Sequence, residues 1–98
     1  MVKVIETALY KLAETNKISL SEAKILNALY KLKAGSFSRI HYETGLEVSE
    51  LYESINSLCE QKIISKNSEL YYCENFAETI SELIRSEKKK IMIPILAK

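Results

Sequence analysis

The sequence predicts a mainly α-helical fold with one small β-hairpin, and three observations lead to this expectation. Apolar residues recur at helical spacing through most of the 98 residues. Only two Gly and one Pro interrupt the chain, too few for a turn-rich sandwich or barrel. The apolar spacing changes to that of a strand only around residues 63–73. A chain of this length has room for one core, so we expect 1–98 to form a single domain.

Two helices are expected before the first glycine. The first covers residues 2–14, and its apolar stripe comprises Val2, Ile5, Leu9 and Leu12. Ser19 and Glu22 have the spacing of a capping box, so Ser19 is expected to cap the second helix. This helix carries two neighbouring apolar rows, which predicts the central position in the core. Gly35, free to adopt a positive φ, is expected to end it.

Two further helices are expected around the second glycine. A short helix runs from Ser36 or Phe37 to Thr44, where Gly45 breaks it. Ser49 is expected to cap the next helix, which runs to about Lys62. The residues expected to face inward are Val48, Leu51, Tyr52, Ile55, Leu58 and Cys59.

A hairpin and a last helix complete the chain. β-branched and aromatic residues in 63–66 and 69–73 flank a polar Asn67-Ser68 turn, which indicates two antiparallel strands. Asn75 is expected to cap a fifth helix that continues through Lys88, Lys89 and Lys90.

This order of elements is that of a winged helix-turn-helix. Two helices that meet at a steep angle need a glycine at their turn, and Gly45 supplies it. Residues 19–73 are then the helix-turn-helix plus wing. The segment 1–14 is an extra N-terminal helix, and 75–98 is a C-terminal helix with an apolar tail.

Several short motifs resemble a known family over about residues 18–90. They are Leu20-Ser-Glu-Ala23, Leu26–Leu29, Gly45-Leu46, Ser49-x-Leu-Tyr52, Ser57-Leu58, Lys62-Ile-Ile64 and Tyr71-Tyr72. In these the chain is similar to the winged-helix domain of archaeal TrmB-type, MarR-like transcriptional regulators. The resemblance implies a DNA-binding domain with the helix from Ser49 in the major groove, and dimerisation through helices outside the core. Family members commonly place Arg in and just before that helix, where this chain has Val48, Glu50 and Asn56.

The charge pattern leaves two interpretations of that helix open. The formal net charge is only +1, so no strongly basic protein is indicated. No basic residue lies between Arg39 and Lys62, whereas five Glu do. In the first interpretation the helix reads DNA through Ser49, Ser54, Asn56 and Ser57, while phosphates are held by Arg39, Lys62, Lys66, Lys88, Lys89 and Lys90. In the second, the acidic helix 49–61 docks a protein partner and binds no DNA.

The two ends of the chain carry more apolar surface than a compact winged helix needs. This excess predicts a homodimer joined through residues 1–14 and 76–96.

No catalytic set or metal site is recognisable, so neither an enzyme nor a cofactor is expected. His41 is the only histidine and has no partner at ligand spacing. Cys59 and Cys73 are expected as two buried thiols, with a disulfide as the alternative.

No segment has the length of a membrane span, which favours the cytoplasm. The acids are all Glu and twelve of the fourteen bases are Lys, a bias found in thermophile proteins.

Overall fold

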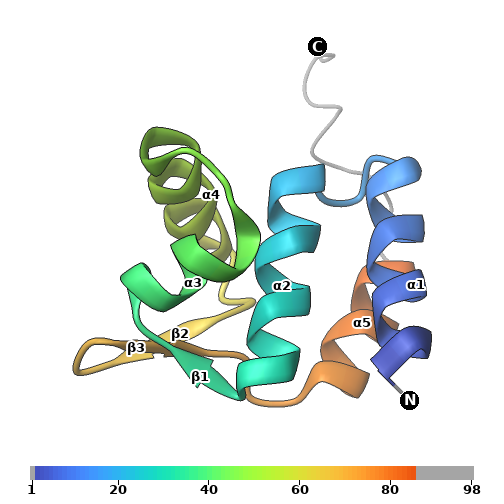
Figure 1. Ribbon diagram of the computed structural model, residues 1–98. Coiled ribbons are helices and arrows are strands. Elements are labelled where there is room, and N and C mark those ends of the chain that lie inside the picture. Colours follow the sequence, from blue (N-terminus) through green and yellow to red (C-terminus); the bar gives the residue numbers. More distant parts are fainter. Residues whose placement is uncertain (1, 86–98) are drawn as a thin grey trace, which may run out of the picture.

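The computed structural model describes residues 2–85, which fold into helices around a small sheet (Figure 1). The elements are α1 (Val2–Glu14), α2 (Leu20–Leu32), β1 (Ala34–Gly35), α3 (Phe37–Thr44), α4 (Val48–Glu60), β2 (Ser65–Asn67), β3 (Leu70–Tyr72) and α5 (Phe76–Arg85). The described part is mostly helical with one antiparallel three-stranded sheet. This is the architecture of a winged helix-turn-helix domain and confirms the predicted fold class.

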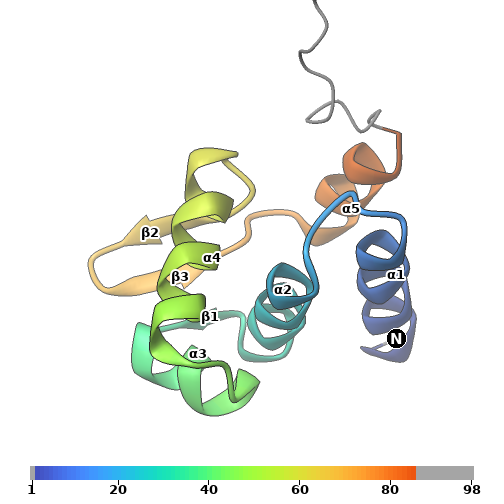
Figure 2. The same cartoon turned by 90° about the horizontal axis from the view of Figure 1, so that it is seen from above.

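Helix α2 is the central element, as its two apolar rows predict. It lies between α1 and α5 on one side and α3 and α4 on the other (Figures 1 and 2). Apolar side chains of α2 pack against these neighbours. Their removal from water is the main source of stability of such a fold. The largest fully buried side chains are Leu9, Ile25, Leu26, Leu29, Ile40, Leu51, Ile55 and Leu58.

The capping box at the start of α2 is confirmed. The Ser19 hydroxyl accepts from the Glu22 amide at 3.1 Å, and Glu22 Oε1 accepts from the Ser19 amide at 2.8 Å. The expected end of this helix is wrong. Lys33, at φ 75°, closes it by donating its amide to the Leu29 carbonyl. Gly35 instead lies in strand β1.

The bend between α3 and α4 forms at Gly45 as predicted. Gly45 has φ 72° and donates its amide to the His41 carbonyl at 2.9 Å. The capping role expected for Ser49 is wrong, because α4 begins at Val48 with Glu47 as a cap that makes no side-chain bond.

The inward face predicted for α4 is right in part. Leu51, Ile55 and Leu58 are buried, but Val48 is 59% exposed and Tyr52 is 60% exposed.

The sheet has the strand order β1-β3-β2, with antiparallel pairing throughout. The hairpin pairs Lys66 with Tyr71, and its turn places Ser68 at φ 65°. Its strands are shorter than expected, because Ile63 and Ile64 precede β2 and pack against the core instead. Strand β1 was not expected; it pairs with the other edge of β3, Gly35 opposite Tyr71.

Helix α5 closes the described part. Asn75 Oδ1 accepts from the Glu78 amide at 3.0 Å, which confirms the predicted cap. The Phe76 ring packs edge-on against Tyr30 with centroids 5.2 Å apart. The predicted extension through Lys88–Lys90 and the apolar tail lie outside the described residues. Within 2–85, none of the helices has the length and apolarity that crossing a membrane requires.

Candidate nucleic-acid interface

Short-range hydrogen bonds form the turn between α3 and α4. Thr44 donates its hydroxyl to the Ile40 carbonyl at 2.8 Å and accepts from the Leu46 amide at 3.3 Å. Leu46 is buried beneath the turn. Gly45 lies between Thr44 and Leu46 in the left-handed conformation. Together with these bonds, it sets the orientation of α4 relative to α3.

Two polar contacts hold α4 against the first turn of α2. Near the start of α4, the Ser21 hydroxyl donates to Glu50. Two turns further on, the Ser57 hydroxyl donates to Oε2 of Glu22 at 2.9 Å. Gln61 adds its amide nitrogen to Ser57 Oγ at 2.9 Å and to the same Glu22 oxygen at 3.4 Å. The row that contains residues 50, 57 and 61 is therefore committed to the fold.

The four polar residues expected to read bases divide between two rows of α4. Ser54 is half-buried and shares the helical row of residues 50 and 57 that meets α2. Ser57 bonds to Glu22 in that row. Ser49 and Asn56 are both exposed and lie seven residues apart, on one side of the helix. Of the four, these two face outward from the domain.

The acidic residues are less uniformly outward than the sequence suggests. Glu43 pairs with Arg39 at 3.5 Å, and Glu50 receives the Ser21 hydroxyl. The other three carboxylates in this stretch occupy exposed positions, namely Glu47, Glu53 and Glu60. The outward face of α4 thus remains acidic, although two of the five carboxylates have partners within the domain.

The predicted phosphate contacts among the described residues flank α4. Lys62 follows α4 at φ 63° and is exposed. Lys66 lies on β2, with its ammonium 5.4 Å from the centre of the Tyr71 ring, a cation–π contact. Arg39 lies on α3, and its side chain is 57% exposed despite its ion pair. Lys88, Lys89 and Lys90 lie outside the described residues.

The wing lies near the end of α4, because the charge of Lys66 on β2 acts on a thiol of that helix. Burial raises the pKa of the Cys59 thiol on α4, while the positive charge of Lys66 acts in the opposite direction. Burial also raises the pKa of Cys73, which donates its thiol to Thr79 at 3.6 Å. Both thiols are free.

A shallow hollow of about 860 Å³ lies beside α3 and was not foreseen. Arg39, Tyr42 and Leu70 are among the residues that line it, together with Ala34 and Gly35 of β1. Tyr42 is 80% exposed. Its spacing of three from Arg39 is the sequence signal that both share one face. Within residues 2–85, no three His, Cys, Asp or Glu are grouped so that they can hold a metal ion.

Comparison with known proteins identifies similarity to a solved structure. No protein-family model matches this sequence. No curated protein matches it either. A solved structure of BpsR from Bordetella bronchiseptica is similar, with a TM-score of 0.56 and 17% sequence identity over 82% of this chain and 70% of that chain. That structure concerns the regulation of DNA binding of BpsR by 6-hydroxynicotinic acid. At this identity the likeness shows a shared fold.

Proposed function

We propose that this protein is a DNA-binding transcriptional regulator of the winged-helix type, acting as a dimer. The observation that carries the proposal is the exposure of three cations on the elements that precede and follow α4 in the chain, Arg39 on α3, Lys62 directly after α4 and Lys66 on β2. A helix with outward polar side chains between two phosphate-binding flanks is the arrangement used to dock a helix in the major groove. The shared fold with BpsR, whose DNA binding is regulated, supports the proposal.

In this proposal Ser49 and Asn56 contact base edges, and Arg39, Lys62 and Lys66 contact phosphates. Asn donates and accepts in the pattern that adenine presents, so Asn56 is the main reader of sequence. Ser57 bonds to Glu22 of α2, and Ser54 is half-buried in the same helical row. Lys88–Lys90 remain further proposed phosphate contacts.

The dimer is proposed to form through residues 1–14 and 76–96, so that two α4 helices face two half-sites. The resemblance to TrmB-type regulators supports an archaeal source, and the Glu and Lys bias supports a thermophilic one. A regulator that binds chromosomal DNA acts in the cytoplasm, which is the location we propose.

Titration with a mixed-sequence duplex of about 30 base pairs tests the proposal at about 50 and about 200 mM salt. Binding that weakens steeply with salt is expected. Lys62→Glu with Lys66→Glu should abolish most of it. The matched control is Lys24→Glu with Lys31→Glu, which makes the same charge change on α2 and should retain most of the affinity. Equal losses in both pairs would show that only net charge matters and would contradict the proposed interface.

A second function is favoured by the composition of the outward face of α4. Val48 and Tyr52 are more than half exposed, with Glu47 and Glu53 in the same stretch of the helix. An apolar centre with acidic neighbours is suited to a partner protein that carries basic residues around an apolar pocket. Absence of duplex binding at low salt would favour this docking function over the regulator.

A further inference from the structure

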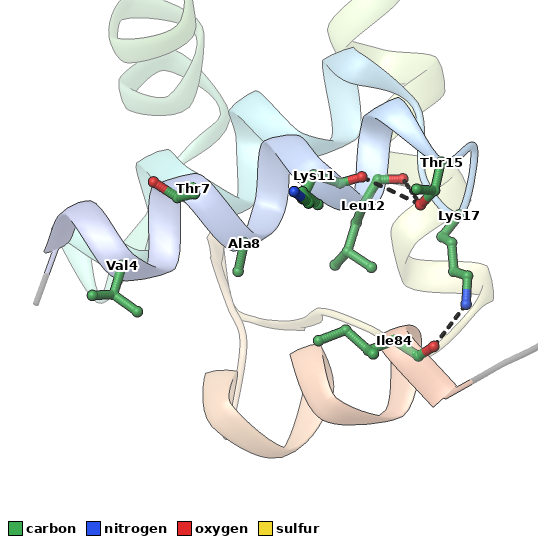
Figure 3. Close-up of a pocket in the computed structure, with 8 residues that line it drawn as sticks. All are labelled: Val4, Thr7, Ala8, Lys11, Leu12, Thr15, Lys17 and Ile84. Carbon is green, nitrogen blue, oxygen red and sulfur yellow. Dashed lines mark hydrogen bonds between the residues drawn. The ribbon is translucent and has the colours of Figure 1, made fainter.

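The hollow beside α3 differs in chemistry from the groove between α1 and α5. The side chains that line that groove include Val4, Ala8, Leu12 and Ile84, so it is largely apolar (Figure 3). The hollow of about 860 Å³ between α3 and the sheet instead combines an aromatic ring, an aliphatic side chain, a guanidinium and two hydroxyls. None of the residues that line it is acidic. A hollow with apolar contact and a few convergent polar groups is suited to a small ligand that has both characters.

The apolar part of the hollow comes from two elements. Tyr42 projects from α3 and is the most exposed of the large apolar side chains among the described residues. Leu70 contributes from the start of β3 and is 46% exposed. An exposed aromatic ring is the surface on which proteins stack bases that have no pairing partner. The ring of Tyr42 can therefore carry a planar aromatic group, with Leu70 as a further apolar contact.

A cation lies next to this ring on the same helix. Arg39 precedes Tyr42 by three positions, which places both on one face of α3. Its ion pair with Glu43 joins Nε to Oε2 at 3.5 Å. The terminal nitrogens of the guanidinium carry further donors, in a fork that matches two oxygens of a phosphate. Because Glu43 offsets part of the positive charge, the ring has to supply part of the affinity for any anion held here.

Two hydroxyls complete the polar part of the hollow. Ser36 Oγ accepts from the Arg39 amide at 3.2 Å, and the O–H of the same group remains a donor. Ser38 is exposed and precedes Tyr42 by one helical turn. Serine hydroxyls beside an arginine bind phosphate oxygens and sugar hydroxyls. The hollow thus offers one partner to each part of a nucleotide, namely base, sugar and phosphate.

We infer that the hollow between α3 and β3 binds one nucleotide whose base is unpaired, with the base on Tyr42 and the phosphate on Arg39. A base inside a duplex is covered by its neighbours on both faces, so it has no face to offer to Tyr42. A free nucleotide and the unpaired last nucleotide of a strand both have such a face and present the same chemistry. The site goes beyond the proposed regulator, since binding of a free nucleotide requires no duplex.

The fluorescence of 2-aminopurine, an adenine analogue whose emission falls when it stacks, tests the inference on the full-length chain. One probe is its free riboside 5′-monophosphate, and the other is a duplex that ends in one unpaired 2-aminopurine nucleotide. At least one of them should be quenched. Tyr42→Ala should weaken this binding on the order of 10-fold, whereas Tyr42→Phe keeps the ring and should retain most of it. Leu20→Ala, at a position of α2 that is more than half exposed, is the control and should leave the binding unchanged.

The phosphate contact has a test of its own. The unmodified chain should bind the 2-aminopurine monophosphate more tightly than the riboside that lacks the phosphate. Arg39→Gln should abolish this difference and leave binding of the riboside unaltered. Lys24→Gln removes the same charge from α2 and should keep the difference. Circular dichroism confirms that each variant is folded.

Each outcome supports or overturns the inference. Quenching of the free monophosphate assigns the hollow to a free nucleotide, and quenching of the tailed duplex alone assigns it to a strand end. Both support a nucleotide site if Tyr42→Ala removes the quenching. Absence of quenching in both probes, or quenching that persists in Tyr42→Ala, overturns the site. Titration with a blunt duplex is a separate readout, so the regulator can fail while the nucleotide site stands, and the reverse.

Discussion

The Ser57 hydroxyl donates a hydrogen bond to Glu22 Oε2 at 2.9 Å, across 35 residues of sequence. The other oxygen of the same carboxylate caps α2 through the Ser19 amide at 2.8 Å. One nearly buried carboxylate thus starts α2 and holds α4 at the same time. The helix proposed to enter DNA is thus held in place by a carboxylate of the neighbouring helix α2.

Glu22→Ala should lower the free energy of unfolding by about 2 kcal/mol, because it removes a capping bond and leaves the Ser57 hydroxyl without its acceptor. Glu22→Gln retains an oxygen acceptor and should cost about half as much. Urea denaturation of both variants measures the difference. Equal stability of Glu22→Ala and the unmodified chain would mean that the carboxylate contributes nothing to holding α4.

Gly45→Ala should cost about 1 kcal/mol, and the cost comes from the backbone alone. Gly45 has φ 72°, and a Cβ there would meet no atom within 4 Å. Asn tolerates this left-handed conformation better than Ala, so Gly45→Asn should be the milder change. Denaturation midpoints rank the two variants, and the reverse order would show that side-chain contacts control the turn.

The features that the sequence predicted correctly are those encoded by neighbouring residues. The capping box at Ser19, the helix break at Gly45 and the Asn75 cap each depend on a few adjacent positions. Strand β1 is different, because its two residues have no period of their own and become a strand only by pairing with Tyr71 and Tyr72. Its presence also explains why Gly35 is extended and α2 ends earlier.

The orientation of side chains on α4 was harder to predict for a related reason. Tyr52 is apolar enough to be assigned to the core. It is exposed because Leu51, Ile55 and Leu58 already fill the face of α4 that is turned to the core. Ser57 is polar and was predicted to contact DNA, and the sequence did not predict that its hydroxyl bonds to Glu22 on another helix. Local patterns do not identify partners that tertiary packing provides.

The alkylation rates of the two cysteines report on the position of the wing. The thiolate is the reactive form, and burial raises the pKa of both Cys59 and Cys73, so alkylation of the native protein should be slow at neutral pH and accelerate as pH rises. Cys59 should react first because it is the less buried.

Lys66→Glu should slow Cys59 alkylation several-fold at a fixed alkaline pH, since it replaces the positive charge that lowers the pKa of that thiol. Cys73 in the same protein is the internal control, because Lys66 is not among the causes of its shift. Mass spectrometry after timed alkylation reports both sites. An equal change at both cysteines would indicate loosening of the fold instead of a local charge effect.

Asn27→Leu should stabilise the protein by about 1 kcal/mol. Asn27 is buried on α2, and within the described residues its Oδ1 has no hydrogen-bond partner. Leu is similar in size to Asn and has no acceptor, so the substitution removes the unsatisfied buried oxygen, which is favourable. Leu is also the better helix former. Asn56→Leu, at an exposed position of α4, measures the contribution of helix propensity alone. If the two substitutions gave equal increases in melting temperature, the buried oxygen would carry no penalty.

Glu43→Gln should strengthen duplex binding a few-fold at low salt. The substitution removes one negative charge beside the proposed interface and releases Arg39 from a pair that holds its guanidinium at 3.5 Å. Without its ion pair, Arg39 can contact a phosphate. The slope of log affinity against log salt should then become steeper by the amount expected for about one additional phosphate contact. Glu82→Gln on α5 makes the same charge change outside the interface and should leave the slope unaltered. If both substitutions acted alike, Arg39 would not be a phosphate contact, and the hollow beside Tyr42 would face solvent in the complex.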